Sequence, residues 1–103
     1  MGFKGRKYIV GDDFGNIRLA KEYRDFSGVK SDDFCRELLD YVKTYSGAVT
    51  MDLSGANIRL NDVASLFHAH AIKVKRGSRF EISGLSEKMT GLFAMALPFW
   101  KVN

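Results

Sequence analysis

The short apolar segment Ala48–Leu53 constrains the fold more than any other part of the chain. An amphipathic helical pattern precedes this segment, and a second one follows it. A brief apolar strand between two helices is typical of the middle of a sheet that helices cover. The strand runs into Asp52-Leu53-Ser54-Gly55, and a loop then leads into the second helix. We expect a functional surface at this junction between strand and helix.

The two flanking helices are predicted from apolar side chains that recur at helical spacing. We expect Ser31 to cap the first helix and Asn61 to cap the second, because both side chains can accept from free first-turn amides. Gly47 and Gly77 are the expected stop signals. The expected inward residues are Phe34, Leu38, Tyr41, Val42 and Tyr45 in the first helix, and Val63, Leu66, Phe67, His70 and Val74 in the second.

The remaining segments predict further strands and a third helix. Residues 7–10 and 17–23 are expected strands joined by a turn cluster, and residues 79–83 alternate as another strand. Ser86 is expected to cap a helix that Pro98 ends, and residues 99–102 can add a last strand. The predicted order is β-β-α-β-α-β-α-β. It indicates an α/β sandwich with a mixed sheet, formed by residues 1–103 as a single domain.

Composition places the chain among ordinary globular domains and locates its charge. Its 103 residues suffice for one domain with a core. Residues 1–52 hold nine Lys or Arg and nine Asp or Glu, so the net charge of +4 lies entirely in the second half. The single cysteine, Cys35, is expected to be a buried inert thiol. With no internal disulfide, signal peptide or long apolar run, we expect a cytoplasmic protein without membrane insertion.

Two segments carry a resemblance to a known family. Val49-Thr50-Met51-Asp52-Leu53-Ser54-Gly55-Ala56 resembles the strand and following loop of the STAS domain, and Arg79–Met89 resembles the later strand, Gly-hydrophobic-Ser loop and final helix of that family. The resemblance implies a STAS-like fold and a non-enzymatic regulatory module of the kind found in anti-sigma factor antagonists. The implied partner is a protein: an anti-sigma kinase-like ATPase, a transporter subunit or another STAS domain, a homodimer included.

The sequence departs from that family at the phosphorylation switch. On this resemblance, the usual phospho-acceptor serine falls on Asn61, which cannot accept a phosphoryl group. Residues 59–64 contain no Ser or Thr, so regulation by a serine kinase at this position is not expected. Asn61 and Asp62 can act as a helix cap, or Asp62 can supply a fixed negative charge at the former switch. The expected partner-binding residues are Ser54, Asn57, Arg59, Asn61, Asp62 and Ser65.

Other functional classes remain open as alternatives. Lys73, Lys75, Arg76 and Arg79 form a basic cluster that can contact an anion or complement the negative end of a helix. This cluster motivates the alternative of a weakly basic nucleic-acid-binding domain, while the resemblance motivates that of an accessory STAS protein of a membrane transporter. A third hypothesis is a small enzyme that uses Asp52 with the histidines as acid and base.

No metal site or cofactor is expected from the sequence. His68 and His70 lie two residues apart on the predicted helix, so their side chains point in different directions and cannot share one ion. We expect His68 at the surface and His70 at the edge of the core.

Overall fold

Four short strands form one mixed sheet. The computed structural model describes residues 6–96. Strands β1 (Ile9–Gly11) and β2 (Asn16–Leu19) are antiparallel, whereas β3 (Val49–Asp52) runs parallel to β2, and β4 (Phe80–Ser83) runs parallel to β3. The strand order across the sheet is β1-β2-β3-β4. The predicted mixed sheet is confirmed for these four strands, and the expected strand at residues 99–102 lies outside the described residues.

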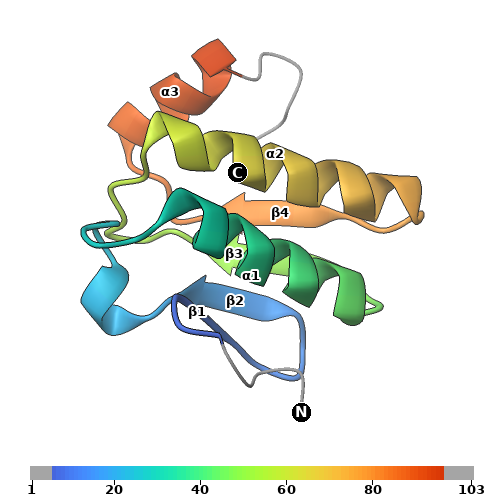
Figure 1. The fold of residues 1–103 in the computed structure, drawn as a ribbon. Coiled ribbons are helices and arrows are strands. Elements are labelled where there is room, and N and C mark those ends of the chain that lie inside the picture. The colour runs from blue at the N-terminus through green and yellow to red at the C-terminus, as the bar shows by residue number, and fades with distance from the viewer. Residues whose placement is uncertain (1–5, 97–103) are drawn as a thin grey trace.

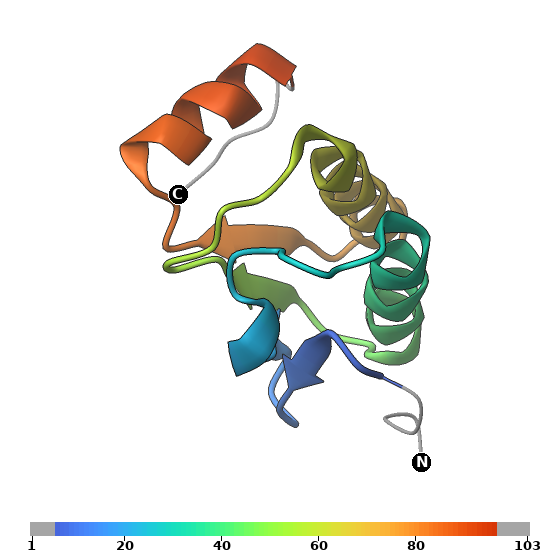
Figure 2. The same ribbon diagram turned by 60° about the vertical axis from the view of Figure 1, so that its left-hand side comes forward.

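Two long helices cover one face of this sheet. Helices α1 (Ser31–Thr44) and α2 (Leu60–Lys75) lie side by side over it (Figures 1 and 2), and they pack against each other. Helix α3 (Glu87–Ala96) follows β4 and contacts α2. Ser86 Oγ accepts the backbone N–H of Met89 at 3.2 Å, which confirms the expected cap of this third helix.

Alternation along the strands separates an apolar face from a polar one. Ile17, Met51 and Ile82 are buried beneath the helices, whereas their neighbours Arg18 and Asp52 are exposed on the opposite face. The core between the sheet and the two long helices is built of aromatic and aliphatic side chains. Its most deeply buried members include Phe34, Leu38, Val42, Val49, Met51, Leu66 and Phe80.

Two expectations about local structure are wrong. The strand predicted for residues 17–23 ends at Leu19, and Lys21–Tyr23 form a short 3-10 helix instead. Ser31 and Asn61 are not helix caps, because α1 is preceded by Lys30 and α2 by Arg59, neither of which makes a side-chain capping bond.

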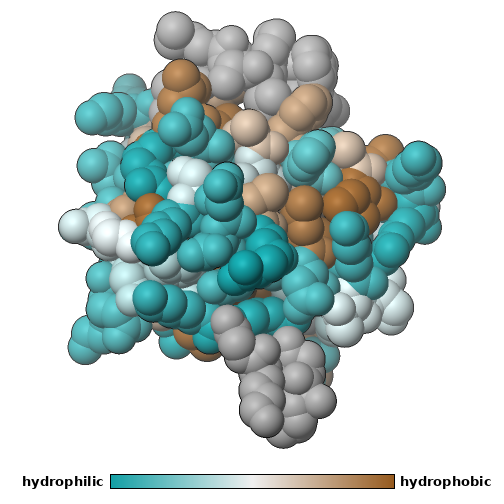
Figure 3. Space-filling model, in the orientation of Figure 1, coloured by the Kyte–Doolittle hydropathy of each residue, from teal (hydrophilic) through white to brown (hydrophobic). Residues whose placement is uncertain are grey.

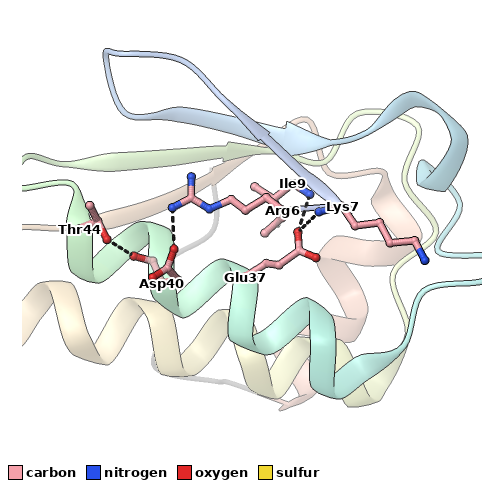
Figure 4. A network of polar contacts seen from close by, with 6 residues as sticks. All are labelled: Arg6, Lys7, Ile9, Glu37, Asp40 and Thr44. Atoms are coloured by element: carbon pink, nitrogen blue, oxygen red, sulfur yellow. Dashed lines mark hydrogen bonds and ion pairs between the residues drawn. The ribbon is translucent and has the colours of Figure 1, made fainter. Parts of the chain in front are cut away.

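A buried carboxylate joins the first strand to α1. One oxygen of Glu37 accepts the backbone N–H groups of Lys7 (2.9 Å), Tyr8 (2.8 Å) and Ile9 (3.2 Å), and the Glu37 residue is only 4% exposed. Figure 4 shows the bonds from Lys7 and Ile9 to Glu37 beside the ion pair between Arg6 and Asp40, whose nearest atoms are 2.8 Å apart. These bonds fix the edge strand of the sheet against the middle of α1.

Candidate functional site

The loop at the carboxyl end of β3 is held in one conformation by its own polar groups. This Asp52 loop comprises residues 52–55. Asp52 Oδ1 accepts the backbone N–H of Ser54 at 2.8 Å and the Ser54 hydroxyl at 2.6 Å. The Leu53 N–H donates to the carbonyl of Ser83 at 2.8 Å, so the loop is also tied to the end of β4. The predicted junction is therefore an ordered turn with its acidic side chain exposed.

Gly84 allows the chain after β4 to pack closely on this loop. Its φ is +76°, a region that glycine adopts readily. A Cβ atom at this position would lie 2.2 Å from Ser54 Oγ and 2.7 Å from Asp52 Oδ1. The close approach therefore requires glycine and limits the movement of the Asp52–Ser54 pair.

The Asp52 carboxylate is stabilised in its charged form. The hydrogen bond from the Ser54 hydroxyl, followed by that from the Ser54 N–H, holds the pKa of Asp52 below its ordinary value of 3.8. The positive charges of Arg24 and Arg18 lower this pKa further. Asp52 is consequently ionised at neutral pH and acts as a hydrogen-bond acceptor.

Two arginines share a cavity with this carboxylate. Arg18 and Asp52 are register partners on adjacent strands, and Arg24 follows the short 3-10 helix after β2. The cavity has a volume of about 220 Å³, and its lining includes Arg18 and Asp52, which are exposed on the sheet face opposite α1 and α2. We call it the Asp52 cavity. It is lined by Arg18, Leu19, Arg24, Asp52, Ser54, Gly55 and Ala56.

The beginning of α2 is organised by an ion pair. Arg59 Nε lies 2.6 Å from Asp62 Oδ2, and the Arg59 guanidinium also lies over the Phe26 ring, 5.7 Å from its centroid. A longer bond of 3.3 Å joins Arg59 to the Ser31 hydroxyl at the start of α1. Arg59 therefore links the entrance of α2 to the segment before α1.

The expected partner-binding residues divide into exposed and buried groups. Ser54, Asn57, Arg59 and Asn61 are exposed and lie along the Asp52 loop and the entrance of α2. Asp62 and Ser65 are 0% and 6% exposed, so the expectation that they lie on the contact surface is wrong. Asp62 can be buried because Arg59 reaches its carboxylate from the surface and compensates the charge.

The basic cluster is largely used within the fold. Lys73 is 1% exposed and donates to the carbonyls of Tyr45 and Gly47, the latter at 2.8 Å. Arg76 donates to the carbonyl of Lys43 at 2.8 Å, so both side chains satisfy carbonyls at and just beyond the end of α1. Lys73 is therefore no surface contact for an anion. Lys75, Arg76 and Arg79 are exposed, and Arg79 lies 3.8 Å from Glu81.

Because Lys73 points inward, the exposed face of α2 differs from the one that the sequence predicts. Val74 was expected to point inward, but it is 52% exposed. Leu60 is also 61% exposed at the other end of the helix. Between them, Ala64 and Ala71 are exposed and Phe67 is half-buried. We call this row the α2 stripe: Leu60, Ala64, Phe67, Ala71 and Val74. Figure 3 shows an apolar patch over the carboxyl-terminal half of α2.

No protein family model, curated protein or solved structure matches this chain. The resemblance to the STAS domain therefore stays a prediction. Within residues 6–96, no helix combines the length and apolar composition needed to cross a bilayer.

The two histidines and Cys35 do not line the Asp52 cavity. Residues 6–96 contain no group of three His, Cys, Asp or Glu side chains placed to hold a metal ion. His68 is exposed and His70 is half-buried, as expected. His70 lines neither the Asp52 cavity nor a second cavity, of about 270 Å³, that Asp52 and Arg18 border together with Asp12 and Asn16. Cys35 is partly exposed, so the expectation of a buried thiol is wrong.

Sequence reasoning missed Arg18, Arg24 and Leu60 as surface features of this site. Alternation in Asn16–Leu19 could have placed Arg18 on the polar face of the sheet. Arg24 carried no such signal, because its position depends on the 3-10 turn that replaces the predicted strand. Leu60 precedes the expected cap, Asn61, and was therefore assigned to the loop.

Proposed function

We propose that this chain is a non-enzymatic regulatory module that binds a protein partner through the exposed face of α2 and the loop before it. The observation that supports this proposal most is the exposed apolar row of the α2 stripe. Its members are spaced by four, three, four and three residues, the pattern with which one helix packs along another. Apolar side chains in such a row lose contact with water when a partner covers them, which favours association.

The charges around the α2 stripe indicate the kind of surface that fits it. The exposed charged residues at the carboxyl end of α2, Lys75 and Arg76, are basic, whereas the charge of Arg59 at the other end is compensated by Asp62. The acidic residue of the helix, Asp62, is buried. A partner with an apolar ridge and an acidic rim would therefore complement this face in both hydrophobicity and charge.

The resemblance to the STAS domain supports the same surface. The resemblance implies that the loop after the central strand and the helix that follows it would contact the partner. Here Asn57 and Asn61 are exposed at that place, beside Leu60. Among the partner classes implied by the resemblance, we favour an anti-sigma kinase-like ATPase. Because Asn61 has no hydroxyl to phosphorylate, binding at this surface would not be switched off by a serine kinase acting at this position.

Nucleic-acid binding is a weaker proposal, because two members of the basic cluster bind backbone carbonyls within the fold. Lys73 is buried, and Arg76 is bound to the carbonyl of Lys43. The remaining exposed cations are too few for the dense positive surface typical of nucleic-acid-binding domains.

Site-specific photo-crosslinking in the cells that produce the protein tests the proposed surface. A photoreactive residue would replace Leu60 in one variant and Val74 in another. The matched control replaces Phe14, which is 79% exposed in the turn between β1 and β2. We expect both α2 variants to capture the same protein and the Phe14 variant not to capture it. Equal capture from all three positions would contradict the proposal.

Binding measurements with the captured protein then test the energetic role of the α2 stripe. Leu60→Glu and Val74→Glu place a charge on the apolar row and should each weaken binding about tenfold or more. Phe14→Glu changes an exposed apolar residue elsewhere and should leave binding unchanged. Sedimentation of the purified chain establishes whether the partner is a second copy. Full affinity in both α2 variants, with folding intact, would refute the assignment.

A further inference from the structure

The Asp52 cavity is lined by two arginines, Arg18 and Arg24, whose charges act on the Asp52 carboxylate without a direct ion pair. Among residues 6–96, neither Arg18 nor Arg24 forms an ion pair within 4.0 Å. Arg18 donates at 3.3 Å to the carbonyl of Leu19, which is a neutral acceptor. The two guanidinium cations and the single carboxylate of Asp52 leave this cavity with one net positive charge.

The Asp52 carboxylate in the cavity can also accept a hydrogen bond from a ligand. One oxygen of Asp52 is occupied by both donors of Ser54, whereas the described residues offer Oδ2 no hydrogen bond. The contact with Gly84 and the bond from Leu53 to Ser83 restrain the loop that carries this carboxylate. A ligand would therefore contact the restrained Asp52 carboxylate and the two arginine side chains, Arg18 and Arg24, beside it.

Gly55 keeps the wall of the cavity open beside Arg24. Its φ is +72°, and a Cβ atom there would lie 3.1 Å from Cδ of Arg24. Glycine thus lets the arginine side chain lie against the backbone of the Asp52 loop. Together with the register pairing of Arg18 and Asp52, this arrangement places three charged residues in the lining of one small cavity.

We propose that the Asp52 cavity binds a small phosphomonoester that also carries a hydrogen-bond donor. A phosphate group has three terminal oxygens and can accept from two guanidinium groups at once, whereas a carboxylate presents a single two-oxygen edge. The donor, an amine or a hydroxyl, would bind the open oxygen of Asp52. The volume of about 220 Å³ is below the roughly 300 Å³ at which sites for drug-sized molecules begin, so the ligand is small.

This site is separate from the α2 stripe but borders the loop before α2. None of the residues of the α2 stripe lines the cavity, whereas Ser54, Gly55 and Ala56 of the loop do. Arg18 and Arg24 belong to neither the loop nor α2, so changing them tests the ligand site while the proposed partner surface keeps its residues.

Titration of the isotopically labelled chain, followed by amide NMR spectra, tests the proposal. The probes are inorganic phosphate, O-phosphoethanolamine and acetate. We expect saturable shifts of the Gly55 and Ala56 amides with the two phosphates, tighter binding of O-phosphoethanolamine, and a weaker response to acetate. Shifts that rise linearly without saturation for every probe would overturn the proposal.

Variants that each remove one positive charge distinguish specific binding in the Asp52 cavity from the general attraction of anions to a basic protein. Arg18→Gln and Arg24→Gln should each weaken O-phosphoethanolamine binding about tenfold or more, since each removes a charge-assisted donor. The control, Arg79→Gln, removes an equal charge from a side chain that is 70% exposed before β4. It should leave affinity nearly unchanged. Equal weakening in all three variants would refute the site.

Asp52→Asn tests the second half of the assignment. Asparagine retains an oxygen for the bonds from Ser54 but loses the negative charge that would attract the amine. We expect this variant to lose the preference for O-phosphoethanolamine over inorganic phosphate while still binding phosphate. An unchanged preference, in a variant whose spectrum shows the native fold, would exclude Asp52 as the ligand's acceptor.

Discussion

Arg59 Nε lies 2.6 Å from Oδ2 of Asp62, and the Asp62 residue is completely buried whereas the Arg59 side chain is 41% exposed. Asp62 Oδ1 makes no hydrogen bond to the described residues. The negative charge of Asp62 therefore depends on one partner that reaches it from the surface. The sequence suggested that Asp62 could supply a fixed negative charge at the surface. Instead, its carboxylate is buried in the first turn of α2, and Arg59 compensates its charge.

The first prediction concerns the removal of that partner. Arg59→Gln leaves a buried carboxylate without its cation and should lower the free energy of unfolding by about 3 kcal/mol. Adding Asp62→Asn should recover part of the loss, because the uncompensated charge is then gone. Urea denaturation of both single variants and the double variant measures the coupling. Strictly additive losses would show that the two side chains do not stabilise each other.

The second prediction concerns the carboxylate that holds β1 to α1. Glu37→Ala removes the acceptor of three backbone N–H groups and should lower the free energy of unfolding by about 2–4 kcal/mol. Glu37→Gln keeps an acceptor oxygen and should cost about 1 kcal/mol. Hydrogen exchange of the Tyr8 and Ile9 amides should accelerate most in the alanine variant.

A neighbour on the same helix provides the control for Glu37. Asp33 pairs with Arg36 at 3.4 Å, and both side chains are exposed, Asp33 by 39% and Arg36 by 69%. Asp33→Asn should therefore change the free energy of unfolding by no more than about 1 kcal/mol. A larger loss for Asp33→Asn than for Glu37→Ala would contradict the assigned roles.

The third prediction concerns the titration of Asp52. Hydrogen bonds from Ser54 hold its folded-state pKa below 3.8, so the resulting stabilisation is present above pH 3.8 and disappears as pH falls through the folded-state value. Ser54→Ala removes the largest cause and should raise the pKa of Asp52 toward 3.8. The effect on stability should be small, because the carboxylate is exposed.

Carboxyl carbon NMR can follow this titration with an internal standard. Hydrogen bonds from Asn16 and Phe14 also lower the pKa of Asp12, independently of Ser54. The midpoint of Asp12 should therefore stay fixed in Ser54→Ala while that of Asp52 rises. If both midpoints move together, the shift reflects a general change in the protein, and the assigned hydrogen bond is not its cause.

Local patterns predicted the order of the described elements but not the rotation of α2. Leu66 was placed inward correctly from helical spacing, whereas Val74 was not. The inward residue at that end of α2 is Lys73, because the carbonyls of Tyr45 and Gly47 need donors there. These groups are 28 and 26 residues away in sequence, so no local hydrophobic pattern contains the information.

In the candidate site, too, the sequence predicts features formed by neighbouring residues but not those that depend on residues far apart in the chain. The Asp52–Ser54 turn was recognisable from four consecutive residues. The position of Arg18 beside Asp52 depends on the register between β2 and β3, and that of Arg24 depends on the 3-10 turn after β2. The pairing of Asp62 with Arg59 was not predicted either, because the expected helix begins after Asn61 and leaves Arg59 in the loop.

The last prediction uses two glycines with nearly the same backbone conformation. Gly77 and Gly84 have φ values of +74° and +76°, so alanine meets a similar conformational cost at both positions, about 1 kcal/mol. A Cβ atom at Gly77 would have no neighbour within 4 Å, whereas one at Gly84 would lie 2.2 Å from Ser54 Oγ and 2.8 Å from the Ser54 backbone nitrogen. The difference between the two variants therefore isolates the steric contact with the Asp52 loop. Gly84→Ala should lose about 1–3 kcal/mol more than Gly77→Ala in urea denaturation, and it should shift the amide resonances of Ser54 and Gly55. Equal losses in the two variants would mean that the loop yields to the methyl group and is not held against Gly84.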